Sequence, residues 1–105
     1  MQYRVDVSSQ AAADLRNLFR YISDTLRAPE NAYAQLTRIR KQILGLAELP
    51  MRFRTYPKHF AGYPQVRIMP VDHFEVFYTV DTGQEKVTIL RVIYGGRDID
   101  RAFMS

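Results

Sequence analysis

Residues 74–96 contain the stretch that decides the fold, FEVFYTVDTGQEKVTILRVIYGG. From Phe74 to Val80 apolar side chains recur at every second position, which is the period of a β-strand with one buried face. The sequence DTGQ at 81–84 is a typical turn between strands. From Val87 to Tyr94 nearly every residue is apolar, as in a central strand covered on both faces. We therefore expect residues 87–94 to form a central strand of a sheet, antiparallel to the strand before the turn.

The chain before residue 50 predicts a strand at 2–7 and two amphipathic helices. The first helix is expected from about Gln10 to Leu26, after a serine that can cap its free N–H groups. The second is expected to begin at Pro29 and to end at Pro50. The inner faces would carry Ala12, Leu15, Leu18, Phe19, Ile22 and Leu26 in the first helix, and Ala32, Leu36, Ile39, Ile43 and Leu46 in the second.

A further strand is expected near residues 66–69, with Val66 and Ile68 facing the helices and Arg67 on the open face. The predicted fold class is α+β. An N-terminal strand and a two-helix hairpin pack on one face of a small twisted antiparallel sheet. A chain of 105 residues fits a single domain, residues 1–105.

Composition excludes several classes of protein. The chain has no cysteine, so disulfides, zinc–thiolate sites and a cysteine nucleophile are excluded. Its two histidines, His59 and His73, match no familiar metal motif, and we expect no metal and no cofactor. No apolar run reaches the roughly 18 residues of a membrane span. The N-terminus lacks a signal-peptide pattern, so we expect a cytoplasmic protein without membrane contact.

Positive charge is concentrated in the middle of the chain. The net charge is +4, and residues 51–71 hold Arg52, Arg54, Lys58 and Arg67 but no acidic residue. Guanidinium groups suit planar contact with phosphate or carboxylate. This segment is either an anion-binding stripe or an ordinary solvated surface.

Two arginines stand inside predicted strands. Arg67 lies between apolar residues, and Arg91 interrupts the most apolar run of the chain. A guanidinium placed there must be paired or face a wet groove. The two arginines therefore predict a concave anion site on neighbouring strands, or else each is paired with a carboxylate such as Asp72 or Glu75.

Two side chains near these arginines could move a proton. Tyr94 ends a strand just before two glycines, and His59 lies in a loop. With arginines to offset phosphate charge, such groups could cleave RNA without metal, through attack by the ribose 2′-hydroxyl. The alternative is that His59 takes no part in the reaction. Tyr78 is expected in the core.

Several blocks together resemble the RelE/ParE toxin superfamily of bacterial type II toxin–antitoxin modules. The blocks run nearly end to end, and the last two are the most specific. They are Tyr3-Arg4-Val5, Ala13-Asp14-Leu15, Tyr21-Ile22, Pro29 with Ala32, Ile43 with Leu46 and Pro50, residues 62–68 (GYPQVRI), residues 74–81 (FEVFYTVD) and residues 89–98 (ILRVIYGGRD).

The resemblance implies a growth-inhibiting toxin with a cognate antitoxin as partner. RelE-like members cut messenger RNA on the ribosome without metal. On that pattern Arg67, Tyr94, Arg97 and His59 would be catalytic, and Arg52, Arg54, Lys58 and Arg91 would hold RNA. ParE-like members instead poison DNA gyrase, and the block around Leu90-Arg91-Val92 is shared with them. The tail has no clear tyrosine after its last arginine. We expect the ribonuclease, with the gyrase inhibitor or an inactive antitoxin-binding homologue as alternatives.

Overall fold

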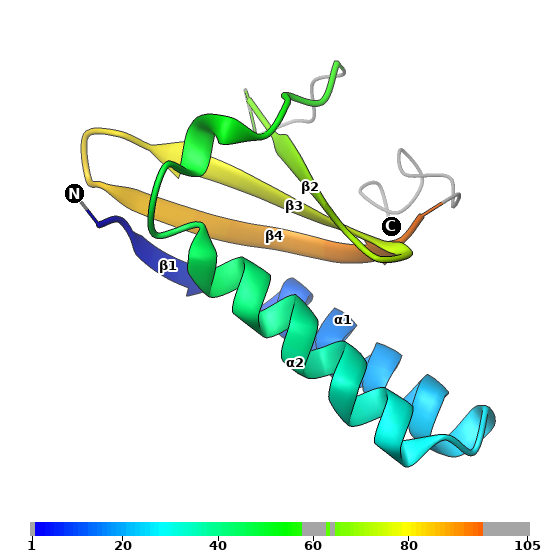
Figure 1. The fold of residues 1–105 in the computed structure, drawn as a ribbon. Helices are drawn as coiled ribbons and strands as arrows, with labels where there is room; N and C mark the ends of the chain where they lie inside the picture. The colour runs from blue at the N-terminus through cyan, green and yellow to red at the C-terminus, as the bar shows by residue number, and fades with distance from the viewer. Residues whose placement is uncertain (1, 58–62, 64, 96–105) are drawn as a thin grey trace.

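A computed structural model describes residues 2–57, 63 and 65–95 of the chain. It is an α+β structure in which two helices cover a four-stranded sheet (Figure 1). The elements in chain order are β1 (Arg4–Val7), α1 (Ser9–Arg20), the π-helical turn η1 (Tyr21–Thr25), α2 (Pro29–Gly45), the 3-10 turn η2 (Pro50–Arg52), β2 (Arg67–Val71), β3 (Phe74–Asp81) and β4 (Lys86–Tyr94). These elements confirm the predicted fold class.

The sheet has the strand order β1-β4-β3-β2, which places β3 and β4 at its centre, as predicted for β4. Strands β2, β3 and β4 form an antiparallel meander. Strand β1 pairs with β4 in parallel, with Val5 opposite Val87, so the sheet is mixed rather than wholly antiparallel. A parallel pair needs a long crossover connection, and the helices, β2 and β3 supply it.

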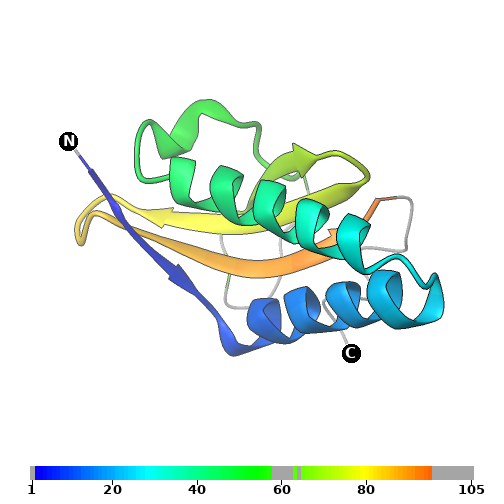
Figure 2. The same ribbon diagram turned by 60° about the horizontal axis from the view of Figure 1, so that its bottom comes forward.

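The two helices form the predicted hairpin along one face of the sheet, as Figure 2 shows. The Ser8 hydroxyl oxygen accepts a hydrogen bond from the Ala11 amide at 3.0 Å and so caps α1. Continuous with α1, the turn η1 carries the helical path to Thr25, close to the predicted end. Helix α2 begins at Pro29. Proline lacks an N–H, but an N–H at the first position of a helix has no acceptor within the helix, so no hydrogen bond is lost.

The sheet buries side chains on both of its faces. The helix-side core joins the inner faces of the helices to the sheet, and Tyr78, Ile89 and Val87 are fully buried in it. The far-side core consists of Val66, Ile68, Phe77, Leu90 and Ile93, with Tyr56 packed against it. Burial on both faces explains the near-continuous apolar run of β4.

One irregularity shifts the register of β4. Phe77 pairs with Arg91, but Tyr78 pairs with Ile89, so Leu90 is an extra residue in β4. Such a bulge bends the strand and re-aims the side chains beside it.

Candidate functional site

Arg67 lies on the helix side of the sheet. It pairs with Tyr78, and directly paired residues share a face. Its Nη1 donates hydrogen bonds to the carbonyl oxygens of Met51 at 3.1 Å and Phe53 at 2.7 Å. Arg67 therefore ties the segment after α2 to the start of β2.

The predicted orientation of this strand is wrong. Val66 and Ile68 are buried in the far-side core, away from the helices. Arg67 lies on the helix side, where Val66 and Ile68 were expected. A strand alternates strictly between two faces, so an error of one residue exchanges both sets of side chains. Because both faces of this sheet are buried, the pattern of apolar residues alone could not decide which residues of β2 face the helices.

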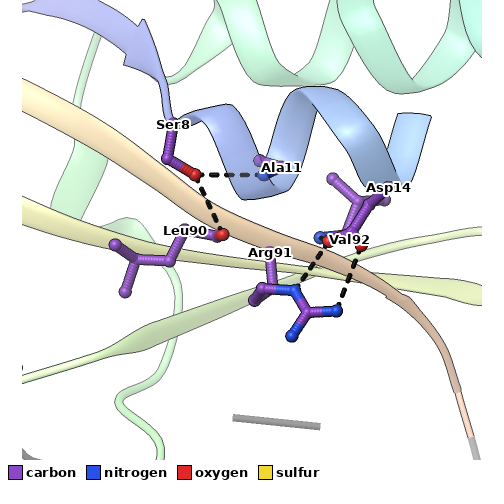
Figure 3. A network of polar contacts seen from close by, with 6 residues as sticks. All are labelled: Ser8, Ala11, Asp14, Leu90, Arg91 and Val92. Atoms are coloured by element: carbon purple, nitrogen blue, oxygen red, sulfur yellow. Dashed lines mark hydrogen bonds and ion pairs between the residues drawn. The ribbon is translucent and has the colours of Figure 1, made fainter. Parts of the chain in front are cut away.

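Arg91 is held in a two-point ion pair with Asp14 of α1 (Figure 3). Its Nε and Nη2 donate to the two carboxylate oxygens at 2.8 and 3.1 Å. The Val92 amide donates to the same carboxylate at 2.9 Å. The pairing alternative for Arg91 is thus the correct one, but the partner is Asp14 rather than Asp72 or Glu75.

The structure does not bring Arg67 and Arg91 together. Strand β3 lies between their strands, so they are not on neighbouring strands as predicted. Arg91 pairs with Phe77, which faces the far-side core, whereas Arg67 pairs with Tyr78. Adjacent residues of β3 face opposite ways, so the two arginines leave the sheet on opposite faces. They do not form the expected concave anion site.

Of the other predicted site residues in the described part of the chain, Arg52 and Arg54 lie beside Arg67 in the segment before β2, whereas Tyr94 lies at the end of β4. Arg52 donates through Nη1 to the carbonyl oxygens of Glu48 at 2.5 Å and Leu49 at 3.1 Å. Arg54 is exposed. Tyr94 is 52% exposed at the end of β4, and its ring meets that of Phe74 edge-on at 5.5 Å. His59, Lys58 and Arg97 lie outside the described residues.

Two titratable groups among the described residues have shifted pKa values. Burial raises the pKa of Tyr78 above its usual 10.0, against the opposing positive charges of Arg67 and Arg52. In the turn between β2 and β3, hydrogen bonds from Arg38 and then Gln35 lower the pKa of Asp72 below its usual 3.8. Tyr78 is buried in the helix-side core, and Asp72 is bound by two side chains of α2, so both shifts arise from contacts that hold the fold.

Helices α1 and α2 form a groove that the sequence analysis missed. Its volume is about 690 Å³, and it is lined by apolar side chains with arginines among them. The lining includes Val7, Leu15, Phe19, Tyr33, Leu36, Ile43 and Leu44, together with Arg16, Arg20 and Arg40. Tyr33 and Leu44 are 65% and 67% exposed. The signal was available, since Tyr33, Leu36, Arg40 and Leu44 form a second stripe at helical spacing on α2.

Within residues 2–57, 63 and 65–95, no group of three or more histidine or acidic side chains is arranged to hold a metal ion. None of the helices described there is long and apolar enough to cross a membrane.

Solved structures of toxins share this architecture. A chain of the chromosomal ParDE toxin–antitoxin system from P. aeruginosa has a TM-score of 0.71 and 22% identity, covering 89% of this chain and 96% of that one. A chain of the archaeal RelE–RelB complex from Pyrococcus horikoshii OT3 has a TM-score of 0.64 and 21% identity, and the match covers 92% of this chain and 99% of that one. A mutant of the E. coli toxin RelE in its free state has a TM-score of 0.62 and 16% identity, and the match covers 98% of this chain and 94% of that one.

These similarities and the fold define a toxin of the RelE/ParE superfamily, as the sequence blocks indicated. No curated protein matches the chain. The family model described as the ParE toxin of the type II toxin–antitoxin system, parDE, matches residues 5–99. The chain therefore belongs to the ParE toxin family of type II toxin–antitoxin systems.

Proposed function

We propose that this toxin inhibits growth by binding DNA gyrase, without a catalytic reaction of its own. The observation that supports this best is the separation of Arg67 and Arg91, because the ribonuclease hypothesis depended on an anion pocket formed by both. Arg67 is engaged by main-chain carbonyl oxygens, and Arg91 is paired with Asp14. The ParE family membership favours the same alternative.

A protein-binding toxin needs surfaces rather than a reactive cluster, and the described residues offer them. Apolar side chains in the groove between α1 and α2 are exposed to solvent, as are others near η2. Apolar side chains that lie together on the surface are typical of protein interfaces.

The cognate antitoxin is the partner that we assign to the groove between the helices. The similar P. aeruginosa and Pyrococcus horikoshii chains come from a toxin–antitoxin system and a RelE–RelB complex. Arg16, Arg20 and Arg40 line the groove beside apolar side chains, so its occupant should be an amphipathic segment with acidic residues. An antitoxin seated there would cover Tyr33 and Leu44.

Expression of the toxin without its antitoxin tests the proposed activity. The expected result is induction of the DNA-damage response while translated transcripts stay intact, because poisoned gyrase leaves breaks in DNA. Prompt cleavage of transcripts without DNA damage would instead establish the ribonuclease. Growth unaffected by the folded toxin would identify an inactive antitoxin-binding homologue.

A further inference from the structure

The loop of residues 48–54, between α2 and β2, has its main chain held by three side chains. Arg52 lies within the loop, whereas Arg67 and Tyr78 come from the sheet beneath it. The carbonyl acceptors are those of Gly45, Glu48 and Leu49 for Arg52, that of Pro50 for Tyr78, and those of Met51 and Phe53 for Arg67. The bond from the Tyr78 hydroxyl is 2.6 Å long and buried. This loop is therefore fixed in one conformation.

Two apolar side chains of this fixed loop point into solvent. Leu49 is 77% exposed and Met51 is 50% exposed. Leu49 also has a φ of 47°, in the left-handed region that leucine rarely adopts. A leucine exposed to this degree buries little apolar surface, so its side chain contributes little to the stability of the fold. Strain that the surrounding structure maintains is characteristic of functional surfaces.

Among the residues that the structure describes, no carboxylate forms an ion pair with the two arginines of this loop or with the adjoining Arg67. Arg52 and Arg67 bind neutral carbonyl groups, so each keeps its full charge, whereas Arg91 is neutralised by a carboxylate. Arg54 is exposed beside them. Glu48 is the one acidic residue of the loop, and its carboxylate lies 3.5 Å from the Gln2 amide nitrogen. The loop and the neighbouring Arg67 of β2 thus combine two apolar side chains with three arginines and one carboxylate, that of Glu48.

We propose that the 48–54 loop is the surface through which the toxin contacts its cellular target. Leu49 and Met51 would enter an apolar pocket of a protein whose surrounding surface is acidic. Methionine and arginine are enriched at protein–protein interfaces relative to the rest of the surface, and arginine is frequent among the residues that dominate binding. A nucleic-acid partner would favour aromatic side chains that stack on bases, and aliphatic ones offer no such platform. Because the loop is held in advance, binding would cost little ordering entropy.

This inference rests on the proposed function, in which the target is gyrase. It concerns a different surface from the antitoxin groove, since none of the residues that line that groove belongs to the loop. In Figure 1 the turn η2 stands beyond the end of α2, above the sheet, while η1 lies at the opposite end of the molecule.

The test compares Leu49→Asn with Leu26→Gln in the full-length toxin. Asparagine tolerates the left-handed conformation, so Leu49→Asn removes the apolar anchor but keeps the backbone of the loop. The control, Leu26→Gln, removes a leucine that is 54% exposed and lies outside both the loop and the groove. Growth arrest without antitoxin, inhibition of purified DNA gyrase and thermal unfolding are measured for each. We expect Leu49→Asn to weaken arrest and gyrase inhibition about tenfold or more at an unchanged Tm, and Leu26→Gln to weaken neither.

Each contrary result has a separate meaning. Full growth arrest by folded Leu49→Asn would overturn the inference, as would equal losses in both variants. If the wild-type toxin does not inhibit gyrase, the proposed function fails, and the growth-arrest comparison alone decides the role of the loop. Binding of a single-stranded RNA oligonucleotide that Arg54→Glu abolishes and Leu49→Asn leaves intact would make the loop a nucleic-acid surface, contrary to the inference.

Discussion

Asp14 and Arg91 are 77 residues apart in sequence, and their two-point ion pair joins α1 to β4. The exposed fractions of the two side chains are 12% and 16%, so the pair is largely shielded from water. The carboxylate also accepts a hydrogen bond from the Val92 amide. Val92 lies beyond the part of β4 that pairs with β1, so Asp14 occupies the edge of β4 there. This arrangement makes Arg91 a residue that holds the fold.

Replacement of Arg91 with methionine should lower the free energy of unfolding by about 3 kcal/mol, since it leaves a shielded carboxylate without its partner. Urea denaturation followed by circular dichroism measures the change. The double variant Asp14→Leu/Arg91→Met should be less destabilised than the sum of the single variants, because neither charge is then left alone. A loss below about 0.5 kcal/mol for Arg91→Met, as for a surface substitution, would show that the ion pair does not hold the fold.

Substitution of Tyr78 by phenylalanine should destabilise the protein by about 1–2 kcal/mol at pH 7, because the carbonyl of Pro50 loses its buried donor. The pKa of Tyr78 is raised in the folded state, so the wild-type advantage is complete below pH 10 and is lost as the pH rises through the folded-state pKa. Denaturation curves of both proteins between pH 7 and alkaline pH measure this. A difference that stays constant over the range would contradict the assignment.

Asp72→Asn tests the ion pair between the β2–β3 turn and α2. Asparagine accepts the φ of 54° at this position but lacks the charge that Arg38 binds at 2.7 Å. The pKa of Asp72 is lowered in the folded state, so its contribution is present above pH 3.8 and is lost as the pH falls through the folded-state pKa. The variant should therefore be less stable than wild type at pH 7, and the two should converge in acid. Equal thermal stability at pH 7 would refute this.

Tyr33→Ala tests the antitoxin groove. Its ring is 65% exposed and meets Phe19 edge-on at 5.0 Å, so truncation removes apolar surface from the groove. We expect the variant to arrest growth like wild type but to resist neutralisation by the co-expressed cognate antitoxin. The control is Gln42→Ala, an exposed residue of α2 that does not line the groove. Normal neutralisation of Tyr33→Ala would place the antitoxin elsewhere.

The order and type of the elements could be predicted because their signals are local. The cap at Ser8, the start of α2 at Pro29 and the apolar run of β4 each depend on a few neighbouring residues. The parallel pairing of β1 with β4 has no such signal, because it depends on a contact across the whole chain.

The candidate site was less predictable than the fold. A guanidinium in an apolar strand indicates that a partner is required, but not which one. Asp14 lies on α1, and its distance from Arg91 follows from how the helix packs beside β4. The face taken by Arg67 depends on which side of the sheet the 48–54 loop covers, which no periodicity encodes. Tyr78 was correctly expected in the core.

The most direct measurement adds the purified, folded toxin in parallel to a plasmid supercoiling reaction with DNA gyrase and to a translation reaction with labelled messenger RNA. We predict that supercoiling is inhibited, with cleaved plasmid accumulating, while the messenger RNA remains intact. Ribosome-dependent cleavage of the messenger RNA with normal gyrase activity would contradict the account.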